Sequence, residues 1–157
     1  MFSNPMMFYL SWPYGVFLGP LVGLFLSYID VRISSALLNR YSQIRQELFM
    51  GKIKPIVEAY SDRRSAALRL AVFPLGEELI RGLLLRIQHS VLHNPLYAVL
   101  LTSVSFTLTR PIPSFAKVAK FLDDVVLSIL NLYLGVIPAW LAHLTFNIVT
   151  MWPYVRR

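Results

Sequence analysis

Apolar residues gather along the chain in five stretches, each long enough for a helix that crosses, or nearly crosses, a lipid bilayer. These stretches are 6–29, 66–92, 95–110, 117–134 and 136–154. A membrane-spanning helix needs about 20 apolar residues, because the hydrocarbon core is about 30 Å thick. The two shortest stretches leave open a tilted or partly re-entrant path. Strand-like alternation is absent, so the pattern predicts an all-α integral membrane protein with about five transmembrane helices.

The segment 31–62 follows the first apolar stretch and has a different pattern. Apolar residues recur there every three or four positions among Arg, Gln and Glu, namely Ile33, Leu37, Leu38, Tyr41, Ile44 and Leu48. This spacing predicts an amphipathic helix with a basic polar face. Such a helix can lie on a leaflet of anionic headgroups, or it can pack in the cytoplasm on its own protein. Residues 1–65 are therefore expected to hold a transmembrane helix and a basic helix, and residues 66–157 to form a four-helix core.

Composition strengthens the membrane prediction. Of the 157 residues, 56% are hydrophobic and 15% are charged, whereas about a quarter of the residues in soluble domains are charged. The chain has no cysteine, so disulfides and thiolate metal sites are excluded. The first apolar stretch lacks a basic start and a small-residue cleavage site, so it is expected to be a retained helix rather than a signal peptide.

Charge is distributed in a way that predicts topology. The net charge is +7, and the basic residues collect near the ends of apolar stretches, within 30–69, within 110–120 and at the carboxyl terminus. This is the distribution of the positive-inside rule, and it argues against a nucleic-acid partner. It predicts an amino terminus outside and a carboxyl terminus in the cytoplasm, in a membrane such as the bacterial inner membrane.

Three charged residues interrupt the second apolar stretch, in the sequence LGEELIRGLL over residues 75–84. Glu77 and Glu78 precede Arg81 by four and three residues, so Arg81 can pair with either glutamate on one helix face. Counted from residue 66, Glu77 lies about 16 Å along the helix, near the midplane. A charge there costs at least roughly 2.5–3.5 kcal/mol, which indicates a functional role. We expect Arg81 to neutralise one carboxylate and the other to be available as a general base.

The last apolar stretch supplies complementary groups in the sequence WLAHLTFN. His143 and Asn147 are four residues apart, on one helix face, at depths of about 10 and 16 Å. A carboxylate, an imidazole and a carboxamide suit hydrolysis of an amide by water. The carboxylate takes the proton, the imidazole orients water or protonates the leaving amine, and the carboxamide stabilises the oxyanion. The sequence therefore predicts that Glu77, Glu78, His143 and Asn147 meet in one catalytic site.

These motifs resemble those of the CPBP intramembrane proteases, a family that includes type II CAAX prenyl endopeptidases and bacteriocin-processing or immunity proteins. That family shows Glu-Glu-x-x-x-Arg, then Phe-x-x-x-His, then His-x-x-x-Asn, each on its own transmembrane helix. The corresponding segments here are 77–81, Phe106–Arg110 and His143–Asn147. The resemblance covers roughly residues 66–150 and implies a four-helix catalytic core that acts on a membrane protein or peptide.

Two positions depart from the family motifs. The glutamate pair is one residue closer to Arg81, so Glu77 matches either the first glutamate, presumed catalytic, or the second, with Gly76 in place of the first. Arg110 stands where the family has histidine, and arginine cannot act as a base because it stays protonated. Arg110 could hold an oxyanion or pair with a glutamate, but we expect it to extend to the headgroups, which is the usual role of an arginine at a helix end.

The family has been interpreted both as metalloproteases and as glutamate-type proteases. A catalytic zinc normally has three protein ligands, and with Arg110 in place of histidine only Glu77, Glu78 and His143 are suitably placed. We therefore expect a glutamate-type reaction with no metal and no cofactor. The leading hypothesis is an intramembrane endopeptidase for a membrane-embedded or lipid-anchored substrate. The alternative is a non-catalytic relative acting in partner binding, assembly or immunity, and an ion carrier would leave His143 and Asn147 unexplained.

Other ionisable residues have simpler explanations. Lys120 precedes Asp123 and Asp124 by three and four residues, which predicts ion pairing at the membrane surface rather than a second acidic site. His89 and His93 lie near the outer end of the second apolar stretch and are expected at the interface.

Overall fold

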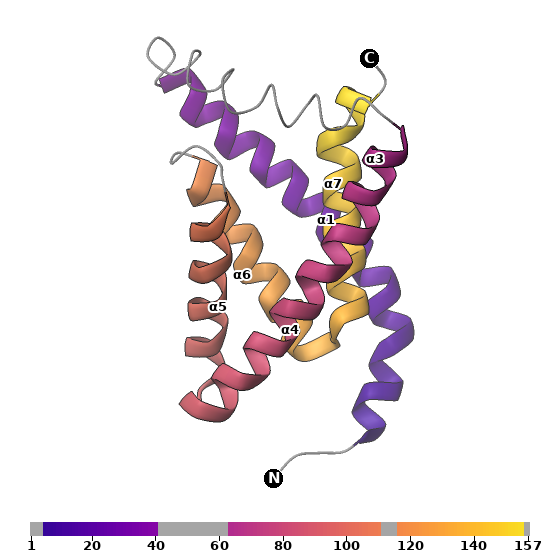
Figure 1. Ribbon diagram of the computed structural model, residues 1–157, viewed down its shortest axis with the longest axis vertical. Coiled ribbons are helices and arrows are strands. Elements are labelled where there is room, and N and C mark those ends of the chain that lie inside the picture. The colour runs from indigo at the N-terminus through magenta and orange to yellow at the C-terminus, as the bar shows by residue number, and fades with distance from the viewer. Residues whose placement is uncertain (1–4, 41–62, 111–115, 156–157) are drawn as a thin grey trace.

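The computed structural model describes residues 5–40, 63–110 and 116–155, which form a bundle of helices (Figure 1). In chain order the elements are α1 (Pro5–Arg40), α3 (Arg63–Ala67), the π-helix η1 (Leu68–Val72), α4 (Phe73–Leu92), α5 (Pro95–Thr109), α6 (Ala116–Leu134) and α7 (Val136–Val155). The described residues contain no strand, so the all-α class is confirmed. The ends of α5, α6 and α7 lie within one residue of the predicted stretches.

Short turns place consecutive helices side by side. Between α4 and α5, His93 adopts a left-handed conformation with φ of 52°, and the Asn94 side chain accepts hydrogen bonds from the first backbone N–H groups of α5. Pro95 follows at the first position of α5, where no intrahelical N–H bond is lost. Between α6 and α7, Gly135 has φ of 92°, a conformation that glycine adopts without steric cost.

The amino-terminal part differs from the prediction in one respect. The first apolar stretch and the start of the amphipathic segment form one helix, α1, which continues without a break through Asp30 to Arg40. No proline or glycine occurs between Gly23 and Arg40 to end it. The rest of the predicted amphipathic helix, residues 41–62, lies outside the described residues, so its placement on a leaflet stays a prediction.

Membrane crossing can be judged from helix length and composition. Among the described residues, one helical stretch, Tyr14–Ile33, is long and apolar enough to cross a bilayer, and Pro95–Thr109 and Val136–Thr150 are shorter apolar helices. The number of five spans therefore stays a prediction.

The interior of the bundle holds polar residues beside apolar ones, and large apolar residues cover much of its exterior. Its buried polar residues include Glu78, Arg81, Thr102, Ser103, Asp124, Ser128, Asn131 and His143. Its exposed large apolar residues include Phe17, Leu21, Phe25, Leu79, Leu83, Ile87, Val91, Leu101 and Leu108. Charged residues are almost never fully buried unless paired, and here the buried charges contact one another, as Arg81 does with Glu78 and Asp124.

Helix α1 packs against α7 through a row of glycines at four-residue spacing, Gly15, Gly19 and Gly23. A Cβ atom added at Gly19 would lie 2.6 Å from the backbone oxygen of Pro138, and one at Gly23 would clash with the backbone oxygen of Ala142. Small residues at this spacing let two helix backbones approach closely, as in many membrane proteins. The row of glycines therefore holds α7 directly against α1.

Candidate active site

Glu78 is the centre of the buried polar cluster. Its side chain is fully buried, and Arg81 Nε lies 3.1–3.2 Å from the carboxylate oxygens. His143 Nδ1 lies 3.0 Å from Oε1, and the Asn131 amide nitrogen donates to Oε2 at 3.1 Å. Groups from α4, α6 and α7 thus converge on one carboxylate, which satisfies a charge that would be unfavourable if buried alone.

Arg81 joins three helices. Its Nη2 donates to Asp124 Oδ1 at 2.9 Å, and its Nη1 donates to the Asp124 carbonyl and to Ser128 Oγ. The guanidinium also lies over the ring of Phe106 on α5, 4.3 Å from the centroid, in a cation–π contact. Of the two glutamates within reach on its own helix, Arg81 contacts Glu78, three residues earlier, and not Glu77.

Asp124 lies in this interior cluster, so its predicted position in a surface ion pair was wrong. Its side chain is 1% exposed and accepts hydrogen bonds from Arg81 and from Thr107 Oγ1, the latter at 2.9 Å. Asp123, its neighbour, does pair with Lys120, at 2.8 Å. The two aspartates point to different surroundings because adjacent residues on a helix lie about 100° apart.

Glu77 has a different environment from Glu78. Its side chain is 40% exposed, and its Oε2 lies 2.9 Å from Arg110 Nη2. Arg110 also approaches Asp124 Oδ1 at 3.5 Å. The expectation that Arg110 extends to the headgroups was therefore wrong, and its alternative role of pairing with a glutamate is the one observed. The adjacent glutamates thus divide into a buried carboxylate held by several donors and an accessible carboxylate beside a guanidinium.

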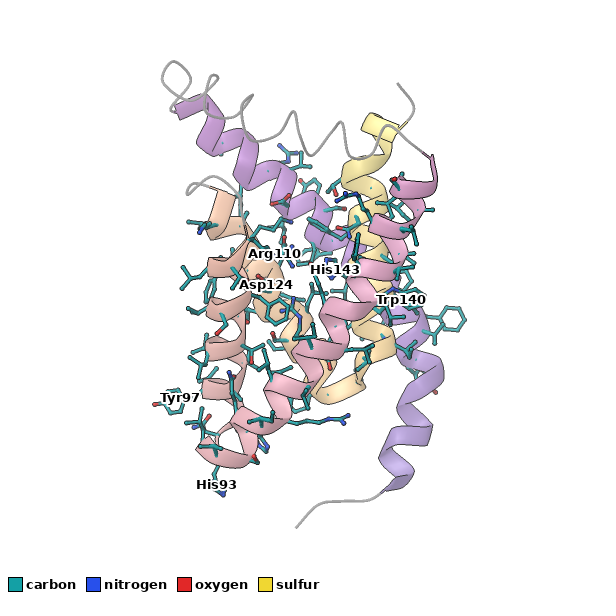
Figure 2. All side chains as sticks on the ribbon, in the orientation of Figure 1. His93, Tyr97, Arg110, Asp124, Trp140 and His143 are labelled. Atoms are coloured by element: carbon teal, nitrogen blue, oxygen red, sulfur yellow. The ribbon has the colours of Figure 1, made fainter. Side chains whose placement is uncertain are left out.

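His143 lies between the two glutamates. Its Nδ1 contacts Glu78 Oε1, and its Nε2 lies 3.7 Å from Glu77 Oε2. Because an ionised carboxylate only accepts hydrogen bonds, Glu78 fixes the proton on Nδ1 and leaves Nε2 turned towards Glu77. Figure 2 shows Arg110, Asp124 and His143 together in the upper part of the bundle.

Asn147 lies one turn beyond His143 on α7 and is partly buried. In the described part of the chain its side chain makes no hydrogen bond to either glutamate, although its carbonyl accepts from Thr150 Oγ1 at 3.4 Å. The structure therefore brings together Glu77, Glu78 and His143 of the predicted set, with Arg81, Phe106 and Arg110 around them.

The sequence interpretation missed Asn131. Its amide nitrogen donates to the Glu78 carbonyl at 2.8 Å as well as to the carboxylate. Gly82 permits this approach, because a Cβ there would lie 2.8 Å from Asn131 Oδ1. A signal was available in the spacing of Asp124, Ser128 and Asn131, which puts three polar side chains on one face of the mostly apolar α6.

The side chains of the cluster are arranged for ion pairing rather than for metal binding. Within the described ranges, no group of three or more His, Asp or Glu side chains is arranged to hold a metal ion. Glu77, Glu78 and Asp124 instead contact the guanidinium groups of Arg81 and Arg110. The donor set of this cluster does not fit a three-ligand zinc site.

Comparisons with known proteins give one match. Searches of curated proteins and of solved structures found none, whereas a protein-family profile described as type II CAAX prenyl endopeptidase Rce1-like matches residues 64–149. The matched region runs from α3 to α7 and includes the glutamate pair, Arg81, Phe106, Arg110 and the His143–Asn147 motif. It covers more than half of the chain and agrees with the CPBP resemblance seen in the motifs. The chain therefore belongs to the Rce1-like family of type II CAAX prenyl endopeptidases.

Proposed function

We propose that the chain is an intramembrane endopeptidase of the glutamate type, which hydrolyses a peptide bond of a membrane-embedded or lipid-anchored substrate. Membership of the family supports a protease in general. The observation that carries the finer proposal is the contrast between the two glutamates, one fully buried and one 40% exposed with its oxygen near His143. Water and a substrate carbonyl can reach Glu77, whereas Glu78 is enclosed by its donors.

In the proposed reaction Glu77 is the general base. A water molecule beside Glu77 Oε2 and His143 Nε2 donates one hydrogen to each acceptor, which the 3.7 Å separation allows. Glu77 takes a proton as the water oxygen bonds to the carbonyl carbon, and the Arg110 guanidinium stabilises the negative carbonyl oxygen. Glu77 then returns the proton to the leaving amine as the carbon–nitrogen bond breaks. Asn147 stays a candidate second donor to the oxyanion once substrate is bound.

Glu78 and Arg81 are assigned positioning roles. Glu78 holds the Nδ1 proton of His143, which keeps Nε2 unprotonated and turned to the water. Arg81 and Asn131 hold Glu78 in turn, and Phe106 covers the guanidinium of Arg81. This arrangement is a buried support that orients the reacting groups, as hydrolysis within a membrane requires.

The proposed location is an integral membrane position, for which the bacterial inner membrane stays the prediction. The large apolar residues that cover much of the exterior support it, since a lipid-facing surface must be apolar. The start of α1 and the end of α7 lie at opposite ends of the bundle (Figure 1). That arrangement supports termini on opposite sides of the membrane, and the outside position of the amino terminus stays a prediction from the charge distribution.

A non-catalytic membrane protein of the same family is the second candidate. It is favoured by one specific observation: Arg110, which stands in place of a histidine, forms a 2.9 Å ion pair with the glutamate that we assign as the base. If that pair persists when substrate binds, it stabilises the ionised form of Glu77 and weakens Glu77 as a base, and the cluster would serve partner binding or assembly.

The two candidates are separated by comparing the termini of membrane proteins by mass spectrometry. The cells would lack this protein and be complemented with wild type, Glu77→Gln, Glu78→Gln or His143→Ala. We expect wild type to restore a processed terminus, and Glu77→Gln and His143→Ala to abolish it. Glu78→Gln should lower both processing and protein abundance, because it leaves Arg81 with Asp124 as its remaining carboxylate partner. If all variants, inserted at equal abundance, restore the same termini, the catalytic proposal is wrong.

A further inference from the structure

A cavity of about 1160 Å³ opens near the α4–α5 turn. Its polar lining consists of Arg86, His89, Ser90, His93, Asn131 and Tyr133, and the rest of its wall is apolar. Figure 2 shows His93 at the lower end of the bundle, well separated from Arg110 and His143. The proposed reaction uses none of the residues that line this cavity except Asn131, which touches both sites.

The lining of this cavity is basic. It includes one arginine and two histidines, and none of the lining residues is acidic. Arg86 forms no hydrogen bond or ion pair with any residue in the described part of the chain, in contrast to the arginines of the Glu78 cluster. A cavity with this lining is complementary in charge to an anion.

The position of Arg86 identifies the kind of anion. Arg86 precedes His93, at the end of α4, by seven residues, or about 10 Å along the helix axis. Under the proposed membrane placement, a charge at that depth is costly unless its side chain extends to the headgroups or meets a counter-charge. Exposed apolar residues Leu83 and Ile87 follow the lining residues Gly82 and Arg86 directly on α4. The Arg86 guanidinium thus lies next to an apolar surface of α4. A ligand with an anionic group and an apolar chain can contact both.

We propose that this cavity binds an anionic phospholipid, with the headgroup phosphate on Arg86 and the acyl chains along the apolar side of α4. Small-molecule sites typically have volumes of about 300–1,000 Å³, and the volume of this cavity is larger. The cavity can therefore accommodate a headgroup with its glycerol, and it is much larger than a lone phosphate ion needs. The proposal rests on the membrane placement proposed above but not on peptide hydrolysis, because its site is separate from Glu77.

Asn131 gives the bound lipid a route to the catalytic cluster. Its side chain lines the cavity and also donates to the carbonyl and carboxylate of Glu78. A ligand that binds the folded state and not the unfolded state stabilises the fold. Lipid in the cavity therefore stabilises the contact that positions Glu78, and the protein is more resistant to thermal unfolding when the lipid is bound.

The test is a titration of the full-length protein in neutral detergent micelles, read by native mass spectrometry. The probes are phosphatidylglycerol, zwitterionic phosphatidylcholine and inorganic phosphate. The variants are Arg86→Gln and, as a matched control, Arg69→Gln, which changes an exposed arginine of η1 that stacks on Phe73. We expect wild type and Arg69→Gln to prefer phosphatidylglycerol to phosphatidylcholine, and Arg86→Gln to bind phosphatidylglycerol about tenfold more weakly, since a charge-assisted bond is lost.

Several results would overturn the proposal. They are equal effects of the two arginine substitutions, equal binding of the two lipids by wild type, and binding of inorganic phosphate without phosphatidylglycerol. The comparison of lipids on wild type needs no variant, so it remains decisive even if Arg86→Gln does not fold. Glu77→Gln should keep full lipid binding, which separates this proposal from the catalytic one. Release of the protein from membranes by alkaline carbonate would instead refute the membrane placement itself.

Discussion

The substitution Asp124→Asn tests the buried ion network most directly. The Asp124 carboxylate accepts hydrogen bonds from Arg81 and Thr107, both at 2.9 Å, and lies 3.5 Å from Arg110. Asparagine keeps the size of the side chain but removes the negative charge. It also replaces one carboxylate oxygen, which accepts hydrogen bonds, with an NH₂ group, which donates them. One of the donors that contact Asp124 then faces another donor.

The magnitude follows from burial. The side chains of Arg81 and Asp124 are 0% and 1% exposed, so water cannot replace the lost charge. Removing one partner of a buried ion pair typically costs about 3–5 kcal/mol of the free energy of unfolding. Because Arg81 keeps Glu78 as a counter-charge, we expect a loss near the lower end, about 3 kcal/mol.

The assay is reversible unfolding of the purified protein in mixed micelles, followed by circular dichroism. Asp123→Asn is the matched control on the adjacent position of α6. Its side chain is also buried, at 6% exposed, but its carboxylate pairs with Lys120, whose side chain is 18% exposed and also lies 3.8 Å from Asp30. Among the described residues its Oδ1 has no hydrogen-bond partner. That substitution should cost less, about 1–2 kcal/mol, because one hydrogen bond to a charged group is lost and Lys120 keeps Asp30 as a counter-charge. A loss for Asp124→Asn no larger than that for Asp123→Asn would refute the assignment of Asp124 to the interior network.

Four further predictions concern helix packing and helix ends, each measured as the free energy of unfolding in the same micelles. Gly19→Ala should destabilise by about 1–3 kcal/mol, because its Cβ meets a backbone oxygen of α7. Gly76→Ala, where a Cβ meets nothing within 4 Å, should stabilise by about 0.5–1 kcal/mol, and equal signs for the two glycines would contradict the α1–α7 packing. Trp140→Phe should cost about 1 kcal/mol through loss of the 2.9 Å bond from Nε1 to the Ala71 carbonyl, whereas no change would argue against that bond. Asn94→Ala should cost about 1 kcal/mol by removing the cap of α5, and a similar loss for Asn94→Asp, which keeps the acceptor, would show that capping is not the cause.

Local spacing explains what the sequence could predict. The ends of α5, α6 and α7 followed from the bounds of the apolar stretches. The contact of Arg81 with a glutamate followed from three- and four-residue spacing on one helix. The contact of His143 with the glutamates followed from their similar depths along two predicted membrane spans. Each of these inferences needs only distances along a helix axis.

Rotation of the helices explains what the sequence could not predict. Which of Asp124 and Asp123 meets Arg81 depends on how α6 turns about its axis relative to α4, which is set by contacts between residues 43 apart in the chain. Arg110 was assigned to the headgroups because an arginine at a helix end usually extends outwards, and the tertiary contact with Glu77 overrides that preference. Asn131 was missed for the same reason as Asp124, although the polar face of α6 carried the information.

The glycine contact between α1 and α7 bears on where the chain can be divided. Leu26 of α1 belongs to the same hydrophobic cluster as Ala139, Ala142 and Phe146 of α7. The region matched by the family profile begins at residue 64, so α1 lies outside it. Even so, α1 packs directly against α7, the helix that carries His143. A fragment starting there would present the small-residue face of α7 to lipid chains, which pack less closely against it than a second helix does. We therefore expect such a fragment to recover its stability when a separate peptide of residues 5–40 is supplied in trans, as in a split protein.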